Sequence, residues 1–218
     1  MNIFPRGPDT WHYHNYLWRG QKMDEVFTAL NNFHRNGSTP VNMAASWGNF
    51  FLNISISEDE PSVWWTFAYR GRPPKKPKIS LPPSIKLSTD EISYICQKGQ
   101  IRISSTAGIQ IYNLTAERLI YEGFRQRILT HPELAAGSVI LHEGYSTEAV
   151  GAQGPGDSAY PFRADHHLML FSAIIPPGSL DMERAALQWS RETVDNWNAG
   201  QPERTANAYV NYAHGVAT

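Results

Sequence analysis

The segment Val63-Trp-Trp-Thr-Phe-Ala-Tyr69 gives the clearest indication of the fold. It is rich in the aromatic and β-branched residues that favour β-strands. Because successive side chains of a strand point to opposite faces, positions 63, 65, 67 and 69 share one face, whereas Trp64, Thr66 and Ala68 share the other. The segment therefore predicts a strand with two distinct faces.

Further strands are predicted on both sides of this segment. Residues 41–56 form one, bent at Gly48, and residues 57–61 form the turn that follows it. The other predicted strands lie at residues 138–145, 166–175 and 208–212. A short helix and strand are expected within residues 92–103, and irregular structure is expected at residues 1–20 and 71–90.

Three stretches show the three- and four-residue spacing of apolar side chains that is typical of helices. The first covers residues 21–36, and the second covers residues 114–129 with Thr115 as its expected N-cap. A third, long helix follows a cap at Ser179 and stops at Gly200.

The alternation of these helices with strands joined by tight turns predicts an α+β fold. Its sheet is antiparallel or mixed and is covered by helices on one face. The other face is then available to line a substrate cavity. The length fits a single domain over residues 1–218.

The composition excludes several classes of partner. The net charge of −1 gives no basic excess, so neither nucleic acid nor an anionic membrane surface is expected. With one cysteine, Cys96, neither an intrachain disulfide nor a zinc site of several cysteines can form. The 12% of aromatic residues suits a pocket for an apolar or aromatic small molecule.

Targeting and cofactor motifs are not recognisable in the sequence. It has no apolar run of membrane-spanning length and no signal-like start, which leaves the cytoplasm, or secretion through a leader outside this sequence, as open localisations. It has no G-x-G-x-x-G after a strand, no P-loop, no H-E-x-x-H and no G-x-S-x-G. The histidine pairs lack a third ligand, so no metal site is predicted.

Alternation along the predicted strands selects candidate site residues. Tyr209 and Asn211 share one face of the last strand and are candidate catalytic hydrogen-bond donors. His142 and Glu143 point to opposite faces, so one of them faces the cavity, and a buried Glu143 with a raised pKa could act as acid or base. Candidate substrate-binding residues share a position on a predicted strand: Trp64, Thr66, Ser46, His166 and His167. For each residue the alternative is a packing role.

Three segments together resemble the C-terminal half of the berberine bridge enzyme-like (BBE-like) FAD-linked oxidases. Asn207-Ala-Tyr-Val-Asn-Tyr-Ala-His214 is similar to that family's Y-x-N-Y-x-D strand, and Asp157-Ser-Ala-Tyr-Pro-Phe-Arg163 is similar to its T-A-F-P-x-R segment. Leu17-Trp-Arg-Gly20, followed by a predicted helix, resembles the entry into the family's substrate domain. The resemblance covers most of the chain.

The resemblance implies a substrate-binding domain whose flavin is carried mainly by a separate N-terminal domain, through covalent links to His and Cys. The sequence shows no counterpart of that domain, and His214 stands where the family usually has Asp. No cofactor is therefore expected for the chain by itself.

Three functions are compatible with such a domain. We favour a cofactor-independent cyclase or pericyclase acting on an apolar polyene or quinone methide, similar to the hetero-Diels–Alderases of fungal tropolone-sesquiterpenoid biosynthesis. The alternatives are a substrate-binding subunit or fragment of an FAD-dependent oxidase, with a partner chain that supplies the FAD domain, and a non-catalytic small-molecule binder. A homodimer is a further way to cover the exposed sheet surface.

Overall fold

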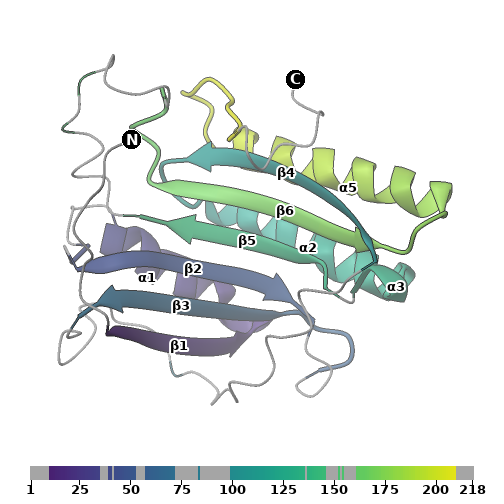
Figure 1. Cartoon of the computed structure of the whole chain (residues 1–218), viewed down its shortest axis with the longest axis horizontal. Coiled ribbons are helices and arrows are strands. Elements are labelled where there is room, and N and C mark those ends of the chain that lie inside the picture. Colours follow the sequence, from purple (N-terminus) through teal and green to yellow (C-terminus); the bar gives the residue numbers. More distant parts are fainter. Residues whose placement is uncertain are drawn as a thin grey trace.

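A six-stranded sheet forms the framework of the molecule (Figure 1). The computed structural model describes residues 10–34, 39–40, 42–52, 57–71, 83, 99–135, 137–145, 152, 154 and 161–209. The strand order is β1-β3-β2-β5-β6-β4, and every described pairing is antiparallel. The strands are β1 (Trp11–Arg19), β2 (Met43–Phe51), β3 (Ser62–Arg70), β4 (Ile101–Ile109), β5 (Val139–Gly144) and β6 (His167–Ile175).

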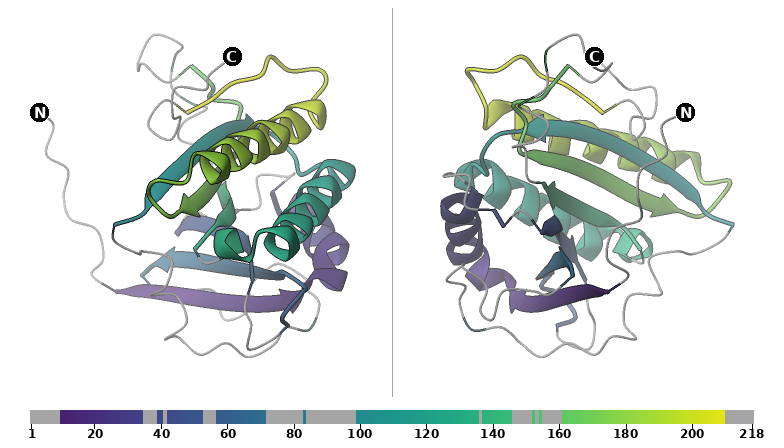
Figure 2. Two further views of the ribbon diagram at one scale, coloured as in Figure 1. Left: turned by 90° about the vertical axis from the view of Figure 1, so that its right-hand side faces the viewer. Right: turned by 60° about the vertical axis from the view of Figure 1, so that its left-hand side comes forward.

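The described helices gather on one face of this sheet, behind the strands in Figure 1 and to one side of them in Figure 2. They are the short η1 (Gly20–Lys22), α1 (Met23–His34), α2 (Leu114–Thr130), α3 (Pro132–Ala135) and α5 (Leu180–Ala199). The predicted α+β fold, with helices on one face of the sheet, is thereby confirmed. None of the described helices has both the length and the apolar character needed to cross a bilayer.

Most predicted elements form close to their expected bounds, but two strands differ. Residues 11–19, expected to be irregular, form β1, an edge strand that pairs with β3. β4 continues to Ile109, well beyond the expected end at residue 103. Its residues 104–108 are Ser, Ser, Thr, Ala and Gly, so the sequence shows no alternation of apolar and polar side chains there. Pairing with β6, rather than local propensity, makes this segment a strand.

The C-terminal strand is the remaining difference. Residues 208 and 209 do not belong to a strand, and residues 210–212 lie outside the described part of the chain. The prediction for this strand is therefore wrong at its start.

Aromatic packing joins the helices to the covered face of the sheet. Phe27 of α1 meets Trp65 of β3 edge to face with 5.9 Å between ring centroids, and both side chains are fully buried. Trp189 of α5 packs in the same way against Phe171 of β6 at 4.9 Å. A separate small cluster of Leu17, Phe51, Trp64 and Val139 lies on the opposite face. The sheet therefore buries apolar side chains on both of its faces.

Helix α2 begins at a cap that differs from the predicted Thr115. The Asn113 side chain accepts hydrogen bonds from the backbone N–H groups of Thr115 at 3.0 Å and Ala116 at 3.1 Å. We expect Asn113→Ala to lower the free energy of unfolding by about 1 kcal/mol. Thr115→Ala, the matched control, should change it by less than about 0.5 kcal/mol in urea denaturation. Equal losses in the two variants would contradict the assignment of the cap.

Candidate functional site

The face of the sheet opposite the helices, called the open face here, carries one continuous row of residues across all six strands. Residues that are directly opposite each other in antiparallel strands point to the same face. The strand register joins these residues, called the central row: Asn15, Thr66, Trp47, Glu143, Leu168 and Gly108. Their neighbours along the strands, Trp65, Met169 and Ala107, belong to the core beneath the helices. Because successive residues of a strand point to opposite faces, the central row lies on the face away from the helices.

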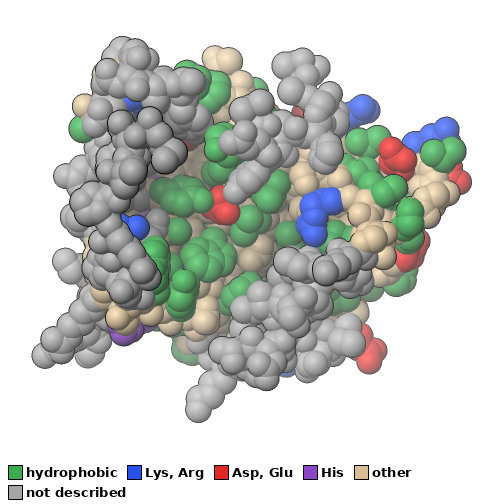
Figure 3. Space-filling model, viewed as in Figure 1, with side chains coloured by type: hydrophobic (Ala, Val, Ile, Leu, Met, Phe, Trp, Pro, Cys, Tyr) green, Lys and Arg blue, Asp and Glu red, His purple; other side chains and the backbone are tan. Residues whose placement is uncertain are grey.

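Hydrophobic side chains dominate the visible part of the open face, with an acidic group among them (Figure 3). Glu143 is the carboxylate that the register places in the central row, between Trp47 on β2 and Leu168 on β6. Tyr13 of β1 packs edge to face against Trp47, with 6.1 Å between ring centroids. The row therefore combines an apolar and aromatic surface with one ionisable group, which is typical of a small-molecule site.

Two opposing effects act on the Glu143 carboxylate. Burial raises its pKa above the ordinary carboxyl value of 4.5, and a hydrogen bond from Tyr145 acts in the opposite direction. The Tyr145 hydroxyl donates this bond to Glu143 Oε2 at 2.6 Å. A partly desolvated carboxylate held by one phenol is chemically suited to accept a proton from a bound molecule.

Trp64 and Thr66, predicted to bind substrate, both point to the open face. Thr66 is 2% exposed and donates a hydrogen bond to Asn15 Oδ1 at 2.6 Å. Trp64 is buried, and its Nε1–H has no hydrogen-bond partner within the described residues. Sequence reasoning missed Trp47 and Asn49 on this face, because β2 carries both apolar and polar residues on each side and its alternation could not be oriented without the partner strands.

Ser46 and His142 point to the covered face instead. The Ser46 hydroxyl accepts a hydrogen bond from Trp65 Nε1 at 2.7 Å. His142 Nε2 lies 2.9 Å from Glu117 Oε2, and both of these side chains are fully buried. His142 and Glu143 therefore lie on opposite faces of the sheet, as their alternation requires. A ligand on the open face cannot reach Ser46 or His142.

His167 also faces the helices, where its ring stacks on Tyr112 with 4.1 Å between centroids. Burial holds its pKa well below 6.5, with smaller effects from nearby histidines. His166 precedes β6 and is partly buried, and burial lowers its pKa as well. Tyr209 is partly buried beyond α5, and Asn211 lies outside the described residues. The structure therefore does not gather all the predicted site residues in one place.

The buried histidines make stability depend on pH. Burial, together with His166, lowers the pKa of His34 to about 4, whereas an unfolded histidine titrates near about 6.5. Below that pH, His34 is protonated in the unfolded chain but stays neutral in the folded chain until the pH approaches 4. We therefore expect the free energy of unfolding to fall by about 1.4 kcal/mol per pH unit for this residue as the pH drops from about 6.5 toward 4.

Urea denaturation at a series of pH values measures this slope. Since His167 contributes in the same direction, His34→Gln should reduce the slope without abolishing it. A slope that is identical in wild type and variant would contradict the assignment of His34 as a buried neutral histidine.

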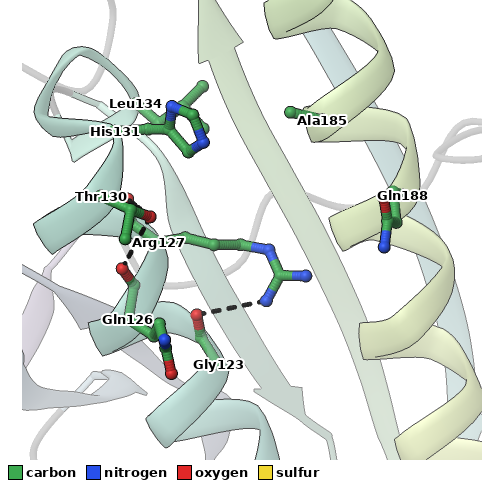
Figure 4. Close-up of a pocket in the computed structure, with 8 residues that line it drawn as sticks. All are labelled: Gly123, Gln126, Arg127, Thr130, His131, Leu134, Ala185 and Gln188. Atoms are coloured by element: carbon green, nitrogen blue, oxygen red, sulfur yellow. Dashed lines mark hydrogen bonds between the residues drawn. The ribbon is translucent and has the colours of Figure 1, made fainter.

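A pocket of about 330 Å³ opens on the other side of the molecule, among α2, α3 and α5 (Figure 4). Arg127 extends into the space between α2 and α5, where it pairs with Glu192 and lies over the Trp189 ring at 5.8 Å. Its charge is thus already balanced by the chain itself. Residues of α2, α3 and α5 line this pocket, so it is separate from the central row.

Comparison with known proteins relates the fold to flavin oxidases. No family model matches the chain. It is 36% identical to the FAD-linked oxidoreductase anuG of Penicillium roqueforti, with 99% of the chain and 45% of that protein covered. It is 38% identical to the FAD-linked oxidoreductase OXR2 of Pyricularia oryzae, with 98% of the chain and 45% of that protein covered.

A solved structure shows a similar fold. The structure of BBE-like #28 from Arabidopsis thaliana superposes with a TM-score of 0.61 at 10% identity and covers 94% of this chain and 46% of the other. The chain thus spans somewhat less than half the length of the curated relatives that it matches. The predicted resemblance to BBE-like proteins is confirmed for the fold, and the relatives are fungal FAD-linked oxidoreductases. These names favour the oxidase alternative over the cofactor-free cyclase.

Proposed function

We propose that the chain forms the substrate-binding part of an FAD-linked oxidoreductase and that its substrate lies on the open face beside Glu143. The observation that carries this proposal is the central row, in which a partly desolvated carboxylate stands within an apolar surface. The similarity to FAD-linked oxidoreductases along nearly the whole chain supports it. A cofactor-free cyclase that uses the same surface is the competing proposal.

The residues of the open face are compatible with a flat ring system. Trp47 and Leu168 supply apolar surface, and Trp64 supplies a buried Nε1–H without a partner among the described residues. We infer that another part of the oxidase would hold most of the FAD ring, and that this face would hold the substrate. FAD supplies a hydride acceptor when bound.

Glu143 has a defined role in this proposal. As a CH–OH group of the substrate becomes C=O, the Glu143 carboxylate takes up the hydroxyl proton. The hydrogen on carbon leaves as a hydride, and FAD would be its acceptor when bound. The Tyr145 hydrogen bond favours the ionised form of the carboxylate, against the larger effect of burial, and orients it. Trp47 and Leu168 hold the apolar part of the substrate and exclude water.

Co-expression tests the proposal. The chain, carrying an affinity tag, is produced together with the part of anuG that lies outside the matched region, and retention of that part is measured. We expect the two to co-purify, Trp47→Arg on the open face to abolish retention, and Leu180→Arg to leave it unchanged, because Leu180 is 67% exposed on α5. Failure to co-purify, together with cyclisation of a polyene or quinone methide by the chain alone, would support the cyclase instead.

A further inference from the structure

A group of polar side chains on the open face lacks hydrogen-bond partners. Trp64 of β3 is directly opposite Asn49 of β2, and Ser62 follows two residues before Trp64 on the same face. Asn49 and Trp64 are each 6% exposed, and Ser62 is 1% exposed. Within the described residues, Trp64 Nε1 and Ser62 Oγ have no hydrogen-bond partner, and no hydrogen bond joins the Asn49 amide to another residue. We call Asn49, Ser62 and Trp64 the Asn49 group.

The polar neighbours of Asn49 form their hydrogen bonds elsewhere. Thr66 and Glu143 are its diagonal neighbours, on β3 and β5. The Thr66 hydroxyl donates to Asn15, and Glu143 Oε2 accepts the hydroxyl of Tyr145. A buried polar group without a partner is unfavourable, and such groups are rare in native proteins. The amide of Asn49 therefore offers unused hydrogen-bonding capacity on the face that we assign to the substrate.

Asn49 lies close enough to Glu143 for one molecule to contact both residues. Trp47 is opposite Glu143, and Asn49, two residues further along β2, is opposite Leu141. Diagonal neighbours on one face of an antiparallel pair are about 7–8 Å apart. A molecule of two or three fused rings spans such a separation, and the side chains of Trp47 and Leu141 give it apolar surface.

The unpartnered groups indicate which chemical group they bind. The Nε1–H of Trp64 can only donate a hydrogen bond, whereas the amide of Asn49 and the hydroxyl of Ser62 can also donate one. The ligand group that all three can bind is an acceptor oxygen. On a flat, apolar ring system, a ring carbonyl supplies such an oxygen.

We propose that Asn49 determines substrate specificity, because its amide, beside the Nε1–H of Trp64, binds a carbonyl oxygen of a flat, apolar substrate. The substrate class is then a fused-ring hydroxyketone whose CH–OH group lies at Glu143. That position of the CH–OH group rests on the proposed function, whereas the carbonyl site at Asn49 does not. A site with unpaired donors discriminates against an analogue that lacks the acceptor.

The variant Asn49→Leu tests whether the amide is unpartnered in the chain. Leucine has a similar size, and no hydrogen bond within the chain is lost, so we expect the urea midpoint of unfolding to stay unchanged or to rise. The matched control is Asn31→Leu. The Asn31 amide donates to the Tyr112 carbonyl at 2.8 Å and accepts the Tyr112 N–H at 2.9 Å, so this variant should unfold at a lower urea concentration. A lower midpoint in Asn49→Leu would reveal a partner within the chain and overturn the proposal.

Two probes test the carbonyl site directly. We use α-tetralone, a fused-ring ketone, and tetralin, the same ring system without oxygen, and follow the indole N–H proton resonance of Trp64, assigned by its loss in Trp64→Phe. We expect α-tetralone to shift this signal and to bind the chain about three- to tenfold more tightly than tetralin. Asn49→Leu should reduce this preference by about threefold or more and leave the affinity for tetralin unchanged.

The outcomes separate the carbonyl site from the proposed function. Equal affinities for the two probes, an unmoved Trp64 signal, or the same preference in wild type and Asn49→Leu would each overturn the carbonyl site. If the chain binds α-tetralone through Asn49 but retains no flavin part on co-expression, only the proposed function is contradicted. An oxidase that retains flavin but shows no preference for α-tetralone would contradict the carbonyl site alone.

Discussion

Glu143→Gln should lower the turnover of the reconstituted oxidase by about 10²- to 10⁴-fold, with KM changed by only a few fold. An amide has nearly the shape of the carboxylate and still accepts the Tyr145 hydrogen bond, but it cannot take up the substrate proton. Glu122→Gln, on the exposed surface of α2, is the control and should leave turnover unchanged. Equal activity of Glu143→Gln and wild type would remove Glu143 from the mechanism.

The hydrogen bond from Tyr145 adds a pH signature to the same experiment. Because this bond lowers the pKa of Glu143 against the effect of burial, its removal in Tyr145→Phe should raise that pKa. Turnover needs the ionised carboxylate, so the acidic limb of its pH profile should move to higher pH in Tyr145→Phe. A shift to lower pH would contradict the role of Glu143 as a base.

Trp65→Ala should lower the free energy of unfolding by about 3–5 kcal/mol. The indole is fully buried, packs edge to face on Phe27, and donates a hydrogen bond to Ser46. Its loss leaves a cavity beneath the sheet and a buried hydroxyl without its donor. In urea denaturation, the exposed Leu180→Ala should cost less than about 0.5 kcal/mol. A loss below about 1 kcal/mol in Trp65→Ala would contradict the packing described for this core.

The sequence allowed most of the fold to be predicted because its helices and central strands carry strong periodic patterns. Helix α1 places Met23, Val26, Phe27, Leu30 and Phe33 at helical spacing, and all of them are buried. β1 and β4 were harder to predict. β1 is an edge strand with four of its nine residues exposed, and the middle of β4 is composed of small residues. Pairing rather than local propensity therefore orders both strands.

The candidate site could be predicted only in part. Alternation showed that His142 and Glu143 face opposite ways, but Ile140 and Leu141 are both apolar, so the sequence did not indicate which side meets the helices. Pairing of β5 with β2 and β6 resolves this. The contacts of Asp165 with Arg204 and Asn207 join residues 39 and 42 positions apart along the chain, and no local pattern indicates such contacts.

The visible absorbance spectrum of the chain co-expressed with the remaining part of anuG tests the central proposal most directly. We expect flavin bands to accompany the wild-type chain and the Leu180→Arg variant through purification. They should be absent from Trp47→Arg, in which a charge replaces an apolar side chain of the central row. Flavin bands of equal strength in Trp47→Arg would show that the open face does not meet the flavin part. A colourless wild-type preparation would contradict the oxidase account.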